Sequence, residues 1–393
     1  MNQKISLTAK ILFAITCLIS LGFAEHLMAN GVNQEAMGKS VLSVEQSDSP
    51  RQTSSELQTV LDKAVTDRKI PGAVMYVSNS EGEWLGASGV RDKESKTPMK
   101  ITDGFSIASM SKTFGAVVVL KLVEDKKIDL DKTIATYLPK EVSPHIVNSS
   151  KITVRQLLNH TSGVAEYLAT EDFKQATAKR SRSQPWTAAE AVKYMYEAKP
   201  QAAPGEKFIY TDSNYILLEL IVEKTTGGTL AQAIRSRILK PLDLKNTFTE
   251  LREPIIGDVA TGYGHRNKDG KTVSFADVND GNGLGDGGLV SNAEDLAKFS
   301  KALFAKKTLL SPKMLKEMLT FKNNSNSYSY GLGVERFPTP YGNAFGHTGT
   351  AYGFLTIMEY VPSKDTTIIV LMNNQDNDVK AIAMKALDVV NTQ

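Results

Sequence analysis

The sequence predicts a mixed α/β fold of the α+β type, in which one antiparallel sheet is flanked by helices and a second part is mainly helical. Two observations predict this arrangement. Short β-rich segments lie near both ends of the chain, and helical patterns fill the region between them. Strands from the two ends can therefore pair into a single sheet. A cleft between this sheet part and the helical part is the natural place for a ligand.

The composition is ordinary for a globular protein with a sizeable core. The chain has 393 residues, of which 41% are hydrophobic and 23% are charged. The net charge of +3, with no block of lysine and arginine, argues against a nucleic-acid or anionic-membrane partner. The single cysteine, Cys17, lies near the N-terminus in a run without charge. The rest of the chain therefore has no thiol for catalysis, metal binding or disulfides.

The N-terminal residues predict an export signal. Lys4 and Lys10 precede the apolar run 11–24, which ends in small residues at the spacing that a signal peptidase needs. The alternative is a retained membrane anchor, but the run is shorter than the roughly 20 residues that a span needs. We therefore expect a cleaved signal peptide at 1–24, a flexible leader at 25–54, and a periplasmic or secreted protein.

The sheet part is expected at about 55–105 and 328–393. A helix over 55–69 has one apolar face, and Pro71-Gly72 ends it. Alternation and β-branched residues then predict strands over 73–79 and 83–90, joined by a turn at 80–82. Four β-rich segments follow near the C-terminus, at 328–337, 344–349, 352–361 and 366–374, and an amphipathic helix over 379–390 closes the chain.

The helical part is expected at about 106–327. Apolar residues at helical spacing, separated by Gly, Pro and Asn, predict helices at 109–124, 153–159, 186–198, 212–226, 229–239, 292–305 and 311–319. With the sheet part these segments form one domain over 55–393, with no internal repeat.

Ser109 and Lys112 are the first candidate catalytic residues. They stand one turn apart where the apolar helix 114–120 begins, so their side chains share a face. A solvated lysine at a helix start would be the ordinary structural explanation for the pair. However, the helix that follows must be buried, and a charge at its end must then be paired.

Two further segments carry candidate residues. Tyr210 and Asp212 precede another buried helix, and His347-Thr348-Gly349 lies on a predicted strand. Each has a structural explanation when it is taken alone: a half-buried tyrosine with a bonded hydroxyl, and a surface histidine. The occurrence of all three segments in this order is much less readily explained by structure alone.

Together these motifs resemble those of the serine β-lactamase and penicillin-binding protein superfamily. They are Ser109-Met-Ser-Lys112, Tyr210-Thr-Asp212 and His347-Thr-Gly349. The likeness is to the class C β-lactamase-like branch, which includes D,D-carboxypeptidases, D-aminopeptidases and esterases. It covers about residues 55–393 and extends to the stretches ITVRQLLNHTSGV (152–164) and DGGLVSNAEDLAKF (286–299). The resemblance implies a β-lactamase/transpeptidase-like fold.

The resemblance also implies roles for individual residues. Ser109 would form an acyl-enzyme, and Tyr210, assisted by Lys112, would take its proton and later deliver it to the leaving group. A protonated Lys112 would stabilise a Tyr210 phenolate or orient its hydroxyl. The backbone N–H groups of Ser109 and Thr350 would stabilise the oxyanion, and Gly349 would let the substrate approach closely. Thr348 could donate a hydrogen bond to a substrate carboxylate or carbonyl.

Two positions depart from the usual pattern of the family. Asp212 stands where Asn is most frequent, so an ionised Asp212 would keep Lys112 protonated, whereas a protonated Asp212 would mimic Asn. His347 stands where other members have Lys, and a largely neutral histidine is a weaker anchor for a substrate carboxylate. The second departure favours peptidase or esterase activity over efficient β-lactam hydrolysis.

The function expected from the sequence is therefore an exported serine hydrolase acting on D-amino-acid peptides, as a D-alanyl-D-alanine carboxypeptidase does, or on small esters. A β-lactamase, a carboxylesterase and a non-catalytic domain that binds penicillin or wall fragments remain alternatives. No cofactor is expected, and the five histidines show no metal-ligand spacing. Expected partners are a small peptide, β-lactam or ester, and peptidoglycan. His160, in the stretch NHTSG, is interpreted as a structural residue at a turn and helix end.

Overall fold

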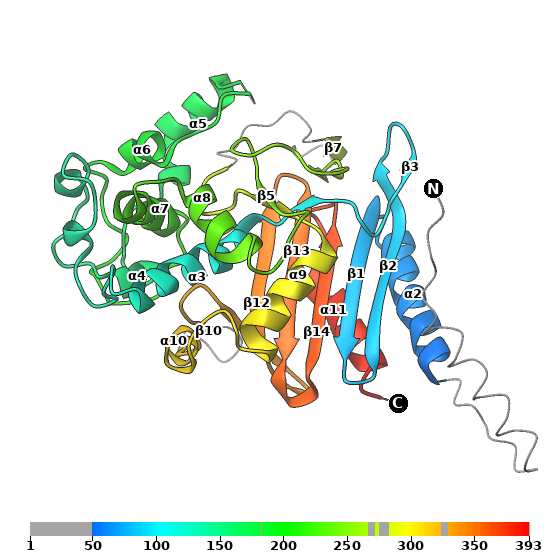
Figure 1. Cartoon of the computed structure of the whole chain (residues 1–393). Helices are drawn as coiled ribbons and strands as arrows, with labels where there is room; N and C mark the ends of the chain where they lie inside the picture. The colour runs from blue at the N-terminus through cyan, green and yellow to red at the C-terminus, as the bar shows by residue number, and fades with distance from the viewer. Residues whose placement is uncertain (1–48, 182, 266–271, 275–282, 324–328, 393) are drawn as a thin grey trace, which may run out of the picture. The chain divides into compact units, whose positions relative to one another are not determined.

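The computed structural model describes residues 49–181, 183–265, 272–274, 283–323 and 329–392. The expected signal peptide and the leader up to residue 48 lie outside these residues. Ser49–Gln393 forms one compact unit. Within its described part, nine strands form an antiparallel sheet in the order β3-β2-β1-β14-β13-β12-β11-β10-β9 (Figure 1). This mixed α/β architecture confirms the fold class that the sequence predicts.

The two ends of the chain meet in the middle of this sheet. β1 (Gly72–Asn79) pairs with β14 (Thr366–Met372), with Val74 opposite Leu371. Both strands are buried over nearly their whole length because helices cover both of their faces. The other strands of the sheet are β2 (Gly82–Asp92), β3 (Thr97–Pro98), β9 (Lys322–Asn323), β10 (Ser329–Tyr330), β11 (Glu335–Thr339), β12 (Gly342–Ala351) and β13 (Phe354–Val361).

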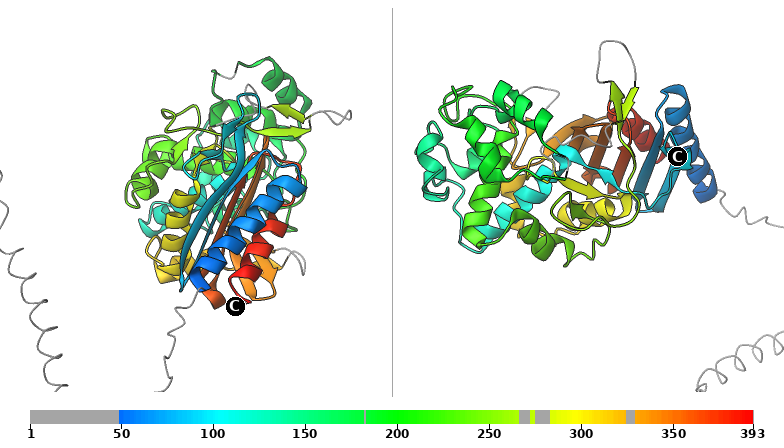
Figure 2. Two further views of the ribbon diagram at one scale, coloured as in Figure 1. Left: turned by 90° about the vertical axis from the view of Figure 1, so that its right-hand side faces the viewer. Right: turned by 90° about the horizontal axis from the view of Figure 1, so that it is seen from above.

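Alternate residues of the central strands pack against different layers of helices. Ala73, Met75 and Val77 face α2 (Ser49–Asp67) and α11 (Val379–Val389), which lie side by side on one face (Figure 2). Residues between them, such as Val74, belong to the larger core formed with α9 (Ala293–Ser300) and the helical part.

The helical part follows the predicted order, with several differences at element ends. The predicted helices are observed as α3 (Ser111–Glu124), α4 (Val154–Leu158), α6 (Ala188–Ala191), α7 (Ser213–Thr226), α8 (Leu230–Ile234), α9 and α10 (Pro312–Met318). α8 and α9 continue into π-helical turns at Arg235–Leu239 and Lys301–Ala305, which accounts for the longer predicted segments. No helix in the described part of the chain is long and apolar enough to cross a membrane.

Some elements have too weak a sequence signal to be predicted. They are α5 (Glu171–Lys179), the small sheet of β4 (Phe105–Ser106), β5 (Phe248–Thr249) and β8 (Leu289–Ser291), and the pair β6 (Tyr263–His265) and β7 (Thr272–Ser274). The strands among them have only two or three residues each, so alternation cannot reveal them.

Two sequence-based boundaries were wrong. The expected flexible leader includes residues 49–54, but α2 begins at Ser49 and its residue Leu57 packs on the sheet. The sequence predicts one strand over 328–337, but the described residues of this segment form β10 and β11 with a turn between them. Gly333 in this turn has φ +77°, and a Cβ there would lie 2.3 Å from the Cβ of Ala116. The chain turns here because its backbone packs directly against α3.

A pair of stacked rings joins α3 to α9. Phe114 and Phe299 are fully buried, with ring centroids 3.8 Å apart and planes inclined by 11°. Since α9 packs on the sheet, this contact ties the helix that follows Ser109 to the sheet layer.

We expect Phe299→Ala to lower the free energy of unfolding by about 3–5 kcal/mol, because it removes a large buried side chain and leaves a cavity. Urea denaturation followed by circular dichroism measures the change. Ile255, which is 75% exposed, provides the matched control, and Ile255→Ala should change stability by less than about 0.5 kcal/mol. Equal effects of the two substitutions would contradict the role of the ring stack.

Candidate active site

Ser109 lies in a tight turn at the entrance to α3. The 3-10 turn Ala108–Met110 leads directly into the helix, and the run after it is buried on all sides. Ala108 has φ +47°, a left-handed conformation that a residue with a Cβ seldom adopts. Such conformations are kept when the surroundings enforce them, and they concentrate at functional sites.

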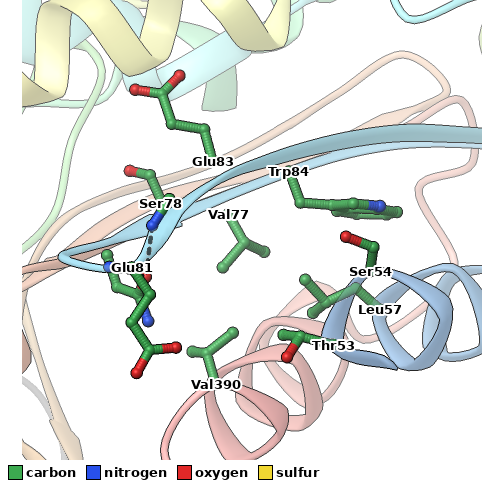
Figure 3. A pocket seen from close by; sticks show the side chains of 11 residues that line it. Thr53, Ser54, Leu57, Val77, Ser78, Glu81, Glu83, Trp84 and Val390 are labelled. Atoms are coloured by element: carbon green, nitrogen blue, oxygen red, sulfur yellow. Dashed lines mark hydrogen bonds between the residues drawn. The ribbon is translucent and has the colours of Figure 1, made fainter. Parts of the chain in front are cut away.

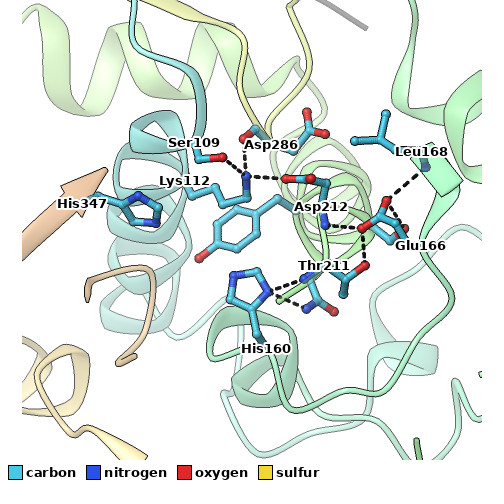
Figure 4. A network of polar contacts seen from close by, with 12 residues as sticks. Ser109, Lys112, His160, Glu166, Leu168, Thr211, Asp212, Asp286 and His347 are labelled. Atoms are coloured by element: carbon cyan, nitrogen blue, oxygen red, sulfur yellow. Dashed lines mark hydrogen bonds and ion pairs between the residues drawn. The ribbon is translucent and has the colours of Figure 1, made fainter. Parts of the chain in front are cut away.

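Lys112 is fully buried, and three oxygen atoms surround its amine. Its Nζ lies 2.9 Å from Ser109 Oγ, 2.5 Å from the carbonyl oxygen of Asp286 and 2.6 Å from Asp212 Oδ1 (Figure 4). An ammonium group has three N–H donors and no lone pair, so these three acceptors match its charged form. The structure thus brings the serine, the lysine and the aspartate of two separate motifs together.

Tyr210 completes the arrangement from the segment before α7. Lys112 Nζ lies 5.2 Å from the centre of the Tyr210 ring. Burial, and then the charge of Asp212, raise the pKa of Tyr210 well above its usual value, while a side-chain hydrogen bond with Ser109 opposes the rise. Tyr210 therefore rests as a neutral phenol beside Ser109, and the phenolate considered from the sequence is disfavoured.

His347 does not line the cleft in which Ser109 lies. It is 1% exposed; its Nδ1 lies 2.5 Å from the Thr348 carbonyl and its Nε2 lies 2.8 Å from the Tyr330 hydroxyl. Since a carbonyl only accepts, Nδ1 carries the proton and Nε2 accepts from Tyr330. Burial lowers the pKa of His347. A neutral, buried His347 offers no charge to a substrate carboxylate, so the expected weak anchor is absent from the cleft.

The rest of this strand segment has partly different roles from those expected. Thr348 donates from its backbone N–H and its hydroxyl to the Glu335 carboxylate. A Cβ on Gly349 would lie 2.2 Å from the carbonyl oxygen of Ile107, so this glycine lets β12 approach the turn of Ser109. The expected close approach of a substrate at Gly349 stays a prediction. Thr350 is exposed and borders the same cleft as Ser109, so their expected roles as oxyanion donors stay a prediction.

The cleft itself encloses about 130 Å³ and is acidic. Its lining includes the carboxylates of Asp212 and Asp286 but neither lysine nor arginine. The residues that line it are Ser106, Ala108, Ser109, Tyr167, Leu168, Asp212, Asp286, Gly287, Thr350, Ala351 and Tyr352. A different pocket, between α2 and the β1–β2 hairpin, includes Trp84 and Leu57 but no lysine or histidine (Figure 3). It therefore lacks an amine beside a hydroxyl, which is the feature that marks the Ser109 cleft.

Several residues of the site were not proposed from the sequence. Asp286 accepts a hydrogen bond of 2.7 Å from the Tyr167 hydroxyl, and Glu166 accepts from the backbone N–H of Asp212 at 2.6 Å. Asp286 is the first residue of the stretch DGGLVSNAEDLAKF, which contributes to the resemblance but assigns no role to this aspartate. Tyr167 and Glu166 lie just after the stretch ITVRQLLNHTSGV, but no spacing rule connects them to Ser109. Among the described residues, no group of His, Cys, Asp and Glu could hold a metal ion.

Crowding of carboxylates affects their ionisation. Burial, followed by the charge of Asp212, raises the pKa of Asp286 to about 7, and the same two causes raise the pKa of Glu166. Asp286 therefore holds a proton in the folded state at pH values where the unfolded chain has released it.

The fold and the Ser109–Lys112–Tyr210 arrangement define a class of protein: serine hydrolases that use a lysine one turn after the serine. The family model described as Beta-lactamase matches residues 57–391, and the chain belongs to this family. The match confirms the superfamily that the sequence motifs resemble.

Individual relatives are similar to this chain over different lengths. Penicillin-binding protein 4* of Bacillus subtilis is 25% identical over 84% of this chain and 74% of its own. Protein flp of Staphylococcus aureus is 29% identical over 49% of this chain, and the match spans 37% of that protein's length. Among solved structures, a D-amino acid amidase from Ochrobactrum anthropi aligns with a TM-score of 0.75 and 26% identity, over 87% of this chain and 99% of its own.

The raised pKa of Asp286 predicts a pH dependence of stability. A carboxyl that binds its proton more tightly when folded stabilises the protein below its unfolded pKa and loses this contribution as pH rises towards 7. We expect Asp286→Asn to remove this loss, because asparagine does not ionise. The free energy of unfolding of the variant, relative to that of the unchanged protein, should therefore increase by about 1–3 kcal/mol between pH 4 and pH 8.

Urea denaturation at several pH values measures the difference, and Glu94→Gln, at an exposed position, is the control whose difference should stay constant. A difference for Asp286→Asn that is also independent of pH would contradict this account of the carboxylates.

Proposed function

We propose that the protein is a serine hydrolase that forms an acyl-enzyme on Ser109 and cleaves amide bonds in D-amino-acid peptides or amides. The observation that carries the proposal is the 2.9 Å contact between Ser109 Oγ and the buried amine of Lys112 in an acidic cleft. A serine hydroxyl is a weak nucleophile unless a base is within hydrogen-bond reach, and this contact meets that requirement. Cleavage of small esters is the second candidate, since the same acyl-enzyme serves both reactions.

The proton path that we propose uses the ion pair and the neutral phenol. A shift of one proton from Lys112 to Asp212, 2.6 Å away, leaves a neutral amine that takes the proton of Ser109 as its oxygen attacks. Tyr210 then gives its proton to the leaving nitrogen and regains one from Lys112, and Asp212 returns its proton to Lys112. This path differs from the one inferred from the sequence, because the raised pKa keeps Tyr210 protonated at rest, so Lys112 and not Tyr210 takes the proton of Ser109.

The charge of the cleft supports an amide substrate with a free amine over one with a free carboxylate. Asp212 and Asp286 border the cleft, and His347 is neutral and buried. A terminal carboxylate, as in a D-alanyl-D-alanine end or a penicillin, would find no free positive charge there, because Lys112 is paired with Asp212. Above about pH 7 it would also meet an ionised Asp286, which would attract an α-ammonium group. The similarity to a D-amino acid amidase is consistent with this preference.

A substrate panel tests the proposed function. We expect D-alanine p-nitroanilide and p-nitrophenyl butyrate to be cleaved, with D-alanyl-D-alanine peptides and a chromogenic cephalosporin turned over more slowly. Ser109→Ala should lower kcat/KM on every substrate by at least about a thousandfold, because it removes the nucleophile. Full activity of Ser109→Ala would contradict the proposal of an acyl-enzyme on Ser109. Faster turnover of the cephalosporin than of the anilide would favour a β-lactamase.

Tyr210→Phe separates the acid role of the phenol from its packing. The substitution keeps the ring and removes only the hydroxyl, so the fold should persist while kcat falls by about a hundredfold or more on the anilide. The loss should be smaller on a nitrophenyl ester, whose leaving group needs no proton. Stopped-flow kinetics on both substrates provides the comparison, and equal losses would argue against proton delivery by Tyr210.

We also propose that the protein is exported, because Lys4, Lys10 and the apolar run 11–24 have the order of a signal peptide. Expression of the full chain followed by N-terminal sequencing of the mature product tests this. A product in the cytoplasmic fraction that begins at residue 1 would contradict export.

A further inference from the structure

His160 lies behind Tyr210, at the end of α4. It follows the last residue of that helix by two positions, is fully buried and has φ +57°. A histidine in the left-handed region is strained, and a helix end of this kind is better satisfied by glycine or asparagine. The structural role that the sequence suggests therefore does not explain why the residue is a histidine.

His160 contacts the backbone before and after Tyr210 as well as the Tyr210 ring. The backbone N–H of Ile209 donates to the His160 carbonyl at 2.9 Å, and the backbone N–H of Thr211 donates to His160 Nδ1 at 3.2 Å. The imidazole also stacks on the Tyr210 ring, with centroids 4.2 Å apart and planes inclined by 23°. One residue thus holds the peptide group between Tyr210 and Thr211, the peptide group that precedes Ile209, and the ring of Tyr210.

The hydrogen bonds fix the protonation state of this imidazole. Nδ1 also receives the side-chain amide of Asn214 at 3.0 Å, and the oxygen of that amide accepts from the Ser162 hydroxyl. An atom that accepts two N–H groups carries no proton, so the proton of the neutral ring is on Nε2. Burial, and then the charge of Lys112, lower the pKa of His160 well below its usual range, so the ring stays neutral.

Nε2 of His160 has no hydrogen-bond partner among the described residues. Around it lie aromatic rings: Tyr330 is perpendicular to the imidazole at 4.7 Å and Tyr215 is tilted at 5.5 Å. A buried N–H without a partner destabilises the folded state, because it has lost its hydrogen bond to water. Strain and an unpaired donor at one residue are expected where position matters more than stability.

We propose that His160 is a positioning residue that holds the Tyr210 phenol against Ser109 and Lys112 through a neutral, Nε2-protonated imidazole. This inference rests on the proposed function, because it assigns His160 a role in the proton transfer performed by Tyr210. The imidazole supplies an acceptor for Thr211, a flat surface for the phenol and no second positive charge beside Lys112.

A double-mutant cycle tests the proposal. His160→Phe keeps a flat ring but removes the acceptor, and should lower kcat on the anilide by about tenfold or more with little change in KM. Each rate is divided by the concentration of active sites, measured as the amount of Ser109 that a fluorophosphonate labels at completion. Molecules that have failed to fold are therefore excluded from the comparison. In a Tyr210→Phe background the same substitution should change kcat by less than about twofold, since the group that it positions is gone.

His145 provides a matched control, because it also stacks on a tyrosine, Tyr196, with ring centroids 4.6 Å apart, but does not line the cleft. His145→Phe should leave kcat unchanged. If His160→Phe lowers the labelled fraction but leaves kcat per labelled site unchanged, or if its effect in the double variant is fully additive, the positioning role is wrong.

A measurement on the unchanged protein covers the case in which His160→Phe does not fold. Proton–nitrogen NMR correlations of the imidazole side chains should show His160 protonated on Nε2 alone throughout pH 6–8, with assignment aided by His145→Phe. A proton on Nδ1, or a charged ring at pH 7, would overturn the proposal. These NMR outcomes do not depend on hydrolase activity, which the substrate panel and Ser109→Ala test separately.

Discussion

The buried ammonium of Lys112 is the interaction on which the site depends. A charge without solvent is tolerated only when all its donors are satisfied, and Lys112 obtains its three acceptors from the turn before α3, from the segment before α7 and from the loop before β8. These acceptors are far apart in the sequence, so Lys112 Nζ connects three separate segments of the chain. Removing any one of them would leave the charge of Lys112 under-paired.

The sheet contributes to the same site by close packing and not by charge. β12 approaches the Ser109 turn because Gly349 has no side chain to meet the carbonyl of Ile107. His347 stands where other members of the family carry a lysine. Here its side chain is buried in a hydrogen bond with Tyr330 and stabilises the packing of the sheet. The positive charge that would face a substrate is thereby lost from the cleft, and the carboxylates of Asp212 and Asp286 set its character.

Much of this architecture could be predicted from the sequence, because long periodic segments and ordered motifs carry strong signals. The central strands, the buried helices α3 and α7, and the meeting of Ser109, Lys112 and Asp212 follow from patterning and from resemblance to the family. The surroundings of these residues could not be predicted in the same way. Asp286, Tyr167 and His160 act through contacts between segments distant in sequence, and no local pattern distinguishes an aspartate in a glycine-rich turn from one beside a buried lysine. The burial of His347 likewise depends on Tyr330 of a neighbouring strand.

The left-handed conformation of Ala108 has a consequence for how a substrate is received. Glycine would adopt this backbone without strain, but it would also leave the turn free to move, whereas an alanine held at φ +47° by a close-packed interior behaves as a stiff pivot at a cost of about 1 kcal/mol. The backbone that carries the Ser109 hydroxyl is thus held in one conformation. Conformational changes on substrate binding must then occur in the substrate or at the rim of the cleft, for example at the exposed Tyr352. The Ser109 hydroxyl keeps its position.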